Sequence, residues 1–514
     1  MKKLTFLYLV CLSVMGFSQN LPFPQHYTYT AASIKPTNYT QSQLDSITKN
    51  FYDKWKAKYF RNSCNASQYF VWFGDEDSTI NCVSEGQGYG MMIAAYMAGY
   101  DPDAKTIYDG LYNYYKAHLD SISFELMAWE QNTACIDTAN ADNATDGDMD
   151  IAYSLLLANK QWGSTGTINY LQEANKLIDS IMVFDINKHS HYTELGDWAD
   201  TNKYPPDSTF DPAYYYATRP SDFMPDHFRA FQTATGDNRW ANVINECYNI
   251  IDTIQTKNSP STGLIPDFVV NLNNALKPAS ANFLEGPYDG EYNYNSCRVP
   301  WRLTTDYLVA GETRAKTSVD KINTWLKSST SNTPSNINSG FYLNGSNLPG
   351  NNYSDPSFIA PFTVGAMTNS ANQTWLNGVY DFLLTQSFDS NTYFPNTLTM
   401  LDLIVISGNY WPPYTISSGI QTSLCNDNSF NLYPNPAKNY ITIESPQEEI
   451  GSGSRQEVVV SIEIYNLLGE KIYTSPITDN RSAITINISD IPSGVNVVEV
   501  KTEKGVEVKR FIKE

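Results

Sequence analysis

The stretch Ala144–Trp162 reads ATDGDMDIAYSLLLANKQW, and it carries two apolar stripes at helical spacing. One stripe consists of Met149, Ala152, Tyr153, Leu156 and Leu157, and the other consists of Ile151, Leu155, Ala158 and Trp162. A helix that is apolar on more than one face is buried on both sides. The stretch therefore predicts a helix enclosed between neighbouring helices rather than one lying on a surface.

Helical periodicity extends from about residue 40 to residue 410, with loops rich in Gly, Pro, Asn and Ser between the segments. Twelve helices with an inner and an outer ring are what a double-layered helical barrel requires. The predicted helices are 43–60, 86–100, 104–119, 148–162, 169–182, 222–236, 240–256, 296–312, 317–329, 355–369, 372–385 and 396–407.

The pattern changes near residue 415. Residues 416–430 are rich in Ser, Gly and Asn and predict a linker, and short alternating runs with turn residues between them follow. In Val458, Val460, Ile462 and Ile464 the apolar period is two, so one face of that strand is expected to be buried. The sequence thus predicts a small all-β sandwich over residues 431–514.

A basic start, Met1-Lys2-Lys3, precedes an apolar run from Leu4 to Phe17 and then Ser18. This order is typical of a secretory signal peptide, which we place at residues 1–18, with the helical domain at 19–415. The run is shorter than the roughly 20 residues of a spanning helix, and we expect no transmembrane segment later in the chain.

The 514 residues contain 34 Lys and Arg against 54 Asp and Glu, a formal net charge of -20. Because nucleic-acid binding needs a basic face, that function is excluded. The acidic balance would suit a cationic polymer, but it also keeps a secreted protein soluble. Six cysteines follow the predicted signal without C-x-x-C spacing, and they are expected as disulfides or as buried thiols. No metal site or cofactor is predicted.

Acidic residues gather in three places. The first, Ser84–Met91, reads SEGQGYGM, in which Ser84 and Gln87 fit a capping box and place Glu85 in the first turn of a helix. We expect the glycines to leave this surface open to a bulky ligand. A general acid needs a raised pKa, so burial or a neighbouring carboxylate must oppose the helix dipole at Glu85. The alternative is a solvated Glu at a glycine-rich helix start.

The second cluster places Asp146, Asp148 and Asp150 at alternate positions, where Thr145 or Asp146 could cap the helix. A calcium loop is disfavoured because the bidentate Glu at its twelfth position is missing. The third cluster, residues 283–302, reads FLEGPYDGEYNYNSCRVPWR. Its aromatic rings could stack on sugars and its Arg residues could hold hydroxyl groups, although an ordinary loop before a helix would look similar.

In this order, Ser84–Met91, Ala144–Trp162 and Tyr294–Arg302 resemble the motifs of glycoside hydrolase family 8 over roughly residues 40–410. The resemblance implies an (α/α)6 barrel, hydrolysis with inversion at the anomeric carbon, and β-1,4-glucan, chitosan or xylan as substrate. It makes Glu85 the general acid and places Asp146 in the centre of the cleft, at the sugar of the −1 subsite.

The general base cannot be assigned from the family's usual position. Many members of the family have an Asp three residues before the Arg, where this chain has Asn295, and an amide cannot take a proton from water. One branch with the same Asn, which includes chitosanases and endoglucanases, takes its base from a Glu in the preceding insertion. Glu285 is our prediction for the base, with Glu291 as the alternative. Further sugar-contacting residues implied by the resemblance are Asn295, Trp129, Trp198, Tyr294, Arg298 and Tyr393, although either Trp could instead belong to the core.

The tail resembles the C-terminal sorting domain of the type IX secretion system in Asn431–Ala437, Ile464–Asn466, Ile491–Gly494 and Lys509–Glu514. This implies a bacterium of the Bacteroidetes type, export through the periplasm and the outer membrane, and a secreted or cell-surface protein. A carbohydrate-binding sandwich is the alternative, but the tail has no Trp for a binding face.

Taken together, the sequence predicts a monomeric, secreted, endo-acting inverting glycoside hydrolase, an all-α (α/α)6 barrel followed by a small all-β sandwich. The preferred substrate is β-1,4-glucan, either cellulose or mixed-linkage glucan. Chitosan and then xylan are the alternatives within the same mechanism. A surface glycan-binding protein without catalysis is the alternative from another class, which the presence of Glu85 and a candidate base argues against.

Overall fold

The protein is described by a computed structural model covering residues 20–75, 77–138, 141–199, 212–388, 392–414, 431–444, 459–466, 471–476, 483–502 and 506–513. The predicted signal peptide and linker lie outside these residues. The chain divides into two compact units, Met1–Thr415 and Ile416–Glu514.

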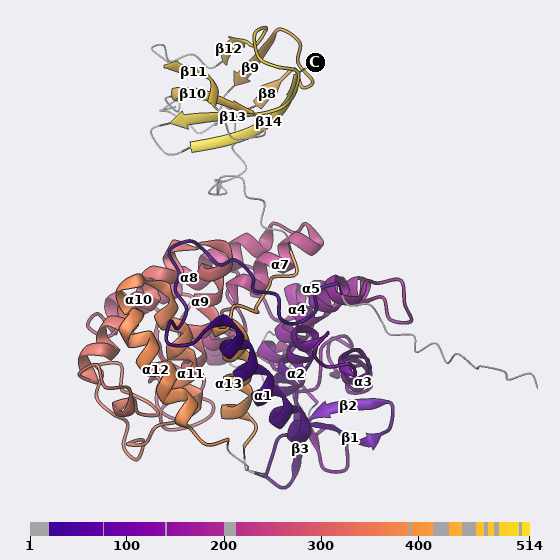
Figure 1. Ribbon diagram of the computed structural model, residues 1–514, viewed down its shortest axis with the longest axis vertical. Helices are drawn as coiled ribbons and strands as arrows, with labels where there is room; N and C mark the ends of the chain where they lie inside the picture. Colours follow the sequence, from indigo (N-terminus) through magenta and orange to yellow (C-terminus); the bar gives the residue numbers. More distant parts are fainter. Residues whose placement is uncertain are drawn as a thin grey trace, which may run out of the picture. The chain divides into compact units, whose positions relative to one another are not determined.

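The first unit contains all the predicted helices, with ends that differ by a few residues from the prediction (Figure 1). The long helices are α1 (Gln41–Tyr59), α2 (Ser84–Met97), α3 (Ala104–Ala117), α4 (Thr145–Trp162), α5 (Tyr170–Phe184), α7 (Pro225–Thr235), α8 (Arg239–Lys257), α9 (Val299–Ala310), α10 (Thr313–Ser329), α11 (Pro356–Gly365), α12 (Gln373–Thr385) and α13 (Phe394–Ile406). The short helix α6 (Pro212–Tyr215) and seven short strands were not predicted: β1 (Phe60–Asn65), β2 (Gln68–Val71), β3 (Ile80–Val83), β4 (Glu130–Asn132), β5 (Ala217–Thr218), β6 (Val269–Val270) and β7 (Lys277–Pro278).

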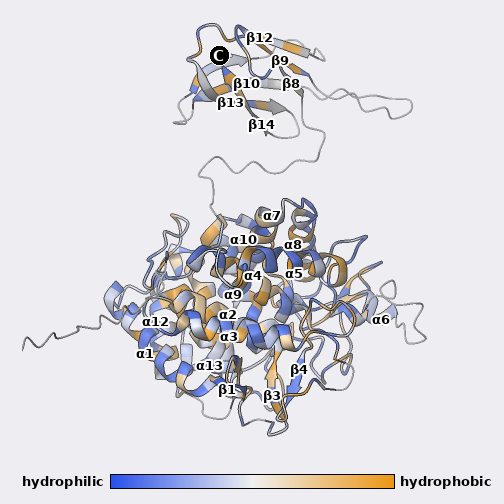
Figure 2. Ribbon diagram, turned by 90° about the vertical axis from the view of Figure 1, so that its right-hand side faces the viewer, coloured by the Kyte–Doolittle hydropathy of each residue, from blue (hydrophilic) through white to orange (hydrophobic). Residues whose placement is uncertain are grey.

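Six helices form an inner set that is buried along most of its length: α2, α4, α7, α9, α11 and α13. Each packs on the next, and α13 returns to α2, so the contacts close into a ring. Figure 2 shows hydrophobic colour along inner helices such as α2 and α4. In α4 both predicted stripes are buried apart from the partly exposed Trp162, which confirms that this helix is enclosed on two sides.

The segment that precedes α1 crosses the carboxyl ends of the inner helices (Figure 1). Its main-chain N–H groups donate to carbonyl groups at or just beyond five of these ends, over distances of 2.7–3.0 Å. The last carbonyls of a helix lack partners within the helix, so this strap supplies the missing donors. The acceptors are Gln161 (α4), Ala98 (α2), Gly408 (α13), Leu308 (α9) and Met367 (α11).

The glycines of α2 have a different role from the predicted one. A methyl group on Gly88 would lie 2.7 Å from Cβ of Asp150 and 2.9 Å from the carbonyl oxygen of Gly147. Two residues later, on the other side of the helix, a methyl group on Gly90 would overlap Val71. All three glycines of the motif are buried. They therefore let α2 and its neighbours approach closely, and the prediction that they leave a surface open to ligand is wrong.

Both predicted helix caps are also wrong. The α2 helix begins after Val83 and α4 begins after Ala144, and neither residue caps its helix through a side chain. The Gln87 amide binds main-chain groups of β2 and α3 instead of closing a capping box. Thr145 donates its hydroxyl to the carbonyl of Glu194, at 2.8 Å. These polar side chains are buried, and they bind main-chain groups of other segments instead of capping their own helices.

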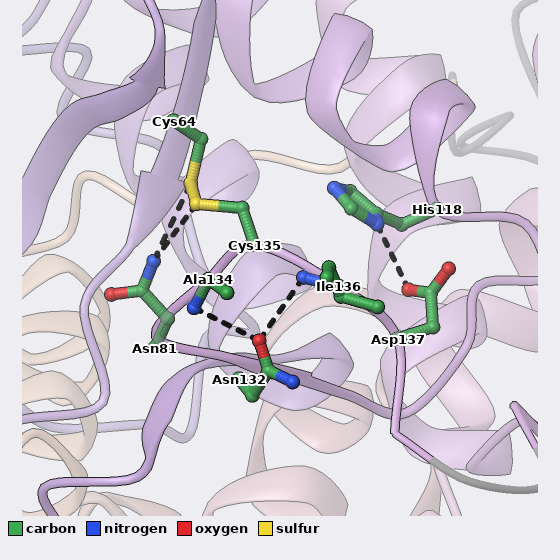
Figure 3. The surroundings of a disulfide bond; sticks show 8 residues. All are labelled: Cys64, Asn81, His118, Asn132, Ala134, Cys135, Ile136 and Asp137. Atoms are coloured by element: carbon green, nitrogen blue, oxygen red, sulfur yellow. Dashed lines mark hydrogen bonds and ion pairs between the residues drawn. A yellow bond between two sulfur atoms is a disulfide. The ribbon is translucent and has the colours of Figure 1, made fainter.

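A disulfide joins Cys64 at the end of the β1–β2 hairpin to Cys135 in the turn after β4 (Figure 3). The Asn81 amide on β3 lies 3.4 Å from each sulfur atom. Since β3 pairs with β4 and leads directly into α2, the crosslink secures the strands at the start of the Glu85 helix. Cys82, Cys247 and Cys297 are buried thiols, and Cys11 and Cys425 lie outside the described residues.

The second unit consists of two antiparallel sheets that share one apolar core. The sheets have the orders β11-β10-β13-β14 and β12-β9-β8. Ile462 and Ile464 are buried, as their period of two predicts. Within the described ranges, no helix is long and apolar enough to cross a membrane. The strands are β8 (Asn431–Tyr433), β9 (Tyr440–Glu444), β10 (Val459–Asn466), β11 (Lys471–Pro476), β12 (Ala483–Asn487), β13 (Gly494–Thr502) and β14 (Val506–Lys513).

The close approach of α2 and α4 can be tested by Gly88→Ala. The added methyl group must push apart main-chain and Cβ atoms that cannot rotate away, so we expect a loss of about 1–3 kcal/mol of unfolding free energy in urea. Gly166→Ala is the control, because a methyl group there meets nothing within 4 Å. Equal stability of the two variants would contradict the packing role of Gly88.

Candidate active site

The amino ends of the inner helices gather the side chains that the sequence singled out. Glu85 and Asp146 lie in the first turns of α2 and α4, and Tyr393 immediately precedes α13. Asn295 and Arg298 lie in the 3-10 turn that leads into α9. Residues from four separate segments thus meet at the end of the ring opposite the strap.

Arg298 is the centre of this cluster, and its side chain is only 1% exposed. Its Nη1 donates to the Glu85 carboxylate and to Asp146 Oδ2, the latter at 2.7 Å. Its Nη2 donates to Ser221 Oγ at 2.9 Å and to Asn295 Oδ1 at 3.0 Å. One guanidinium therefore orients both acids and the amide at once, as its fixed fork of donors allows.

The Glu85 carboxyl group is 16% exposed and also accepts a hydrogen bond from the Tyr393 hydroxyl. Burial raises its pKa to about 7, with a further upward contribution from Asp146, against the lowering effect of Arg298 and Tyr393. Burial acts on Asp146 in the same direction, but the charges of Arg298 and Arg219 outweigh it and hold the pKa of Asp146 below its usual value. Near neutral pH the cluster can hold a proton on Glu85 while Asp146 is ionised.

Glu285 lies on the loop before α9, and its side chain is 47% exposed. Its Oε2 accepts a hydrogen bond from Asn295 Nδ2 at 2.6 Å, and its Oε1 accepts one from Arg219 Nη2 at 2.9 Å. The Asn295 amide thus accepts from Arg298 with its oxygen and donates to Glu285 with its nitrogen. An ionised Asp at this position would have no donor for Glu285, which gives a physical reason for the amide.

The three Asp residues of α4 have three separate roles. Asp146 faces Arg298, whereas Asp150 accepts two hydrogen bonds from Arg302, at 2.9 and 2.6 Å, and one from His227 at 2.9 Å. Asp148 accepts from the Met127 main chain at 2.8 Å and from the Asn143 amide at 3.0 Å. Only Asp146 joins the cluster, and the other two fix α4 to its neighbours. Among the described residues no group of His, Cys, Asp and Glu could hold a metal ion.

Three predicted sugar-contacting residues remain, namely Trp129, Tyr294 and Trp198. Trp129 is 42% exposed, and its carbonyl accepts the Ser84 N–H, so it lies beside the start of α2. Tyr294 donates its hydroxyl to Asp355 Oδ2 at 3.0 Å, in front of α11. Trp198 is half-buried and packs edge-on against Tyr214 in a small apolar cluster.

Glu291 lies in the same loop as Glu285, but its carboxylate binds a main-chain N–H group. Its Oε2 accepts the N–H of Leu343 at 2.7 Å, and its side chain is half-buried. None of its described hydrogen bonds involves Glu85, Asn295 or Arg298.

Arg219 and Ser221 were not found by sequence reasoning. They lie around the 3-10 turn Pro220–Asp222, between β5 and α7, and reach Glu285 and Arg298 respectively. The short stretch Arg-Pro-Ser-Asp has the composition of an ordinary turn before a helix. Only the ring of helices brings it to the site, so no local signal could have identified it.

Comparison with known proteins identifies the family of this chain. The sequence model of glycosyl hydrolases family 8 matches residues 22–407, three quarters of the chain, and includes every residue of the cluster. The chain belongs to glycosyl hydrolases family 8. Residues 431–514 match the secretion system C-terminal sorting domain, which favours the export role of the tail over a sugar-binding one.

Several relatives are similar to this chain over most of their length. A beta-glucanase of Niallia circulans is 49% identical over 76% of this chain and 91% of its own. An endoglucanase of Bacillus sp. (strain KSM-330) is 41% identical over 78% of this chain and 84% of its own. Among solved structures, a beta-1,3-1,4-glucanase from Paenibacillus sp. X4 is 48% identical, with a TM-score of 0.72 over 76% of this chain and 99% of that one.

The electrostatics of the cluster predict that the Glu85 carboxyl group loses its proton near pH 7. In Tyr393→Phe the carboxylate loses a hydrogen bond that stabilises its charged form, so the midpoint should move to higher pH. Difference infrared spectra against Glu85→Gln at stepped pH would isolate this carboxyl group. Tyr294→Phe is the control, since its hydroxyl binds Tyr353 and Asp355. A lower midpoint in Tyr393→Phe would contradict the assigned contact.

Proposed function

We propose that this chain is a secreted, endo-acting, inverting glycoside hydrolase that cleaves β-1,4 bonds in β-glucan. In this proposal the six inner helices and the other six long helices form an (α/α)6 barrel over residues 19–415. The two sheets of residues 431–514 form a β-sandwich, joined to the barrel by a linker at 416–430. The ring closed by contacts between α13 and α2 supports the barrel.

Glu85 acts as the general acid. Its pKa of about 7 keeps a proton available near neutral pH, and its partly exposed carboxyl group can deliver that proton to the leaving glycosidic oxygen. Asp146 remains ionised beside it and can stabilise the positive charge that develops on the sugar ring of the −1 subsite. The two carboxyl groups thus have opposite protonation states in one small cluster.

Glu285 acts as the general base. Two donors, Asn295 and Arg219, bind its separate oxygens and fix its orientation. In an inverting reaction a water molecule stands between the base and the sugar, so acid and base must be roughly 6.5–9.5 Å apart. Glu85 and Glu285 share no hydrogen bond, and the side chains of Arg298 and Asn295 connect them. The Asn295 amide that couples Glu285 to Arg298 is the observation that carries this proposal.

The relatives support β-glucan as the polymer. The solved structure that is 48% identical is named for β-1,3-1,4-glucan, and the 49% identical relative is named a beta-glucanase. We therefore propose mixed-linkage β-glucan as the preferred substrate, with cellulose chains cut more slowly. Chitosan is the second candidate, because a net charge of -20 would attract a cationic polymer.

The sorting-domain match supports export to the cell surface or the medium. We propose that residues 1–18 direct the chain to the periplasm, and that residues 431–514 then direct it through the type IX machinery. The sugar-cleaving unit would reach polymers that are too large to enter the cell.

Reducing-sugar release from mixed-linkage β-glucan, carboxymethylcellulose, chitosan and xylan, measured side by side, tests the substrate. We expect the highest kcat/KM on mixed-linkage β-glucan and a rapid fall in viscosity, because an endo-acting enzyme cuts within chains. A clear preference for chitosan would move the assignment to the second candidate. Inactivity on all four polymers, with binding retained, would favour a glycan-binding protein.

The acid and base assignments are tested on the best polymer of that panel. Glu85→Gln and Glu285→Gln should each lower kcat by about 10²–10⁴-fold, because each removes one proton-transfer group. Glu291→Gln is the matched control from the same loop, and it should keep a kcat within a few-fold of the wild type. A dead Glu291→Gln with an active Glu285→Gln would overturn the choice of base.

A further inference from the structure

The loop that carries Glu285 has no regular secondary structure between β7 and the turn before α9, yet a catalytic base must be held in place. The side-chain partners Arg219 and Asn295 fix the carboxylate, but they do not fix the main chain from which it projects. The residue that does so is Asp289, four positions further along the loop.

Asp289 is only 3% exposed, and its carboxylate accepts three consecutive main-chain N–H groups. Its Oδ2 accepts from Leu284 at 2.7 Å and from Glu285 itself at 3.1 Å, and its Oδ1 accepts from Gly286 at 2.8 Å. Three consecutive main-chain donors converge on one buried carboxylate and hold the loop, because each would lose its partner if the acid were absent.

Asp289 is also bound to the rest of the unit through its main chain. The carbonyl of Asp289 accepts the Phe268 N–H at 2.8 Å, next to strand β6. The β6 strand pairs with β5, and Arg219 directly follows β5. The small sheet β5-β6-β7 therefore connects Asp289, which fixes the Glu285 main chain, to Arg219, which binds the Glu285 side chain.

We propose that Asp289 is the positioning residue for the base: its buried carboxylate fixes the main chain of Glu285 so that the Glu285 carboxylate stays between Arg219 and Asn295. This inference rests on the proposed role of Glu285. Asp289 acts through Glu285, since the Asp289 carboxylate binds main-chain N–H groups.

A double-mutant cycle of Asp289→Asn and Glu285→Gln tests the inference. Asp289→Asn keeps the shape of the side chain but turns one acceptor into a donor that faces main-chain N–H groups, so kcat should fall by about 10–100-fold with KM nearly unchanged. In the Glu285→Gln background the same substitution should change kcat by less than about twofold, because two residues that act as a unit are not additive.

Asp120→Asn is the matched control. Asp120 is a buried acid that holds its own loop through the N–H groups of Ile122 and Ser123, and it has no described contact with the cluster. The kcat of Asp120→Asn should stay near that of the wild type, even if its free energy of unfolding falls as much as that of Asp289→Asn.

The outcomes separate the two claims. An Asp289→Asn enzyme with the wild-type kcat, or one whose loss is just as large in the Glu285→Gln background, would overturn the positioning role and leave the base assignment intact. A Glu285→Gln enzyme with the wild-type rate would overturn the base, and the positioning role with it.

Hydrogen exchange of the wild-type protein gives a test that needs no folded variant. The amides of Leu284, Glu285 and Gly286 should exchange far more slowly than those of exposed loops. Exchange at the rate of an exposed loop would contradict the hydrogen bonds from these amides to Asp289.

Discussion

The buried guanidinium of Arg298 is the interaction on which the site depends. It binds Glu85 and Asp146 through one nitrogen and Ser221 and Asn295 through the other, so four segments of the chain are fixed relative to one another. A buried Arg without acidic partners would be costly, and two buried acids without a cation would repel each other. Each member of the cluster therefore makes the burial of the others tolerable.

The ring of helices makes this arrangement possible. Inner helices that all present their amino ends to one side bring first-turn residues from distant parts of the sequence together, while the strap near the amino terminus binds the opposite ends. The dipoles of these helices favour negative charge, which suits the ionised Asp146. Glu85 nevertheless retains a raised pKa because burial and Asp146 outweigh the lowering effect of Arg298 and Tyr393.

Periodicity was sufficient for the twelve long helices of the first unit, because each of them buries an apolar stripe that a sequence displays directly. Glu85 does lie in a first turn, but the capping box from which this was predicted is absent, and Asp146 lies within the first turn of α4 instead of capping it. The local role of small and polar residues could not be deduced in the same way. Gly88 suggested a surface that a ligand can approach, and Gln87 suggested a helix cap. Both residues instead make contacts with segments that are distant in sequence. Arg219 likewise reaches Glu285 only through the fold.

The central claim is that Glu85 donates a proton while Glu285, held by Asn295, activates a water molecule on the opposite face of the sugar. Proton NMR of the first products released from mixed-linkage β-glucan tests it most directly, because the anomeric signal reports the face that water attacked. The α-anomer should appear first and then convert to the equilibrium mixture. The β-anomer as the initial product would mean retention of configuration and would contradict the account.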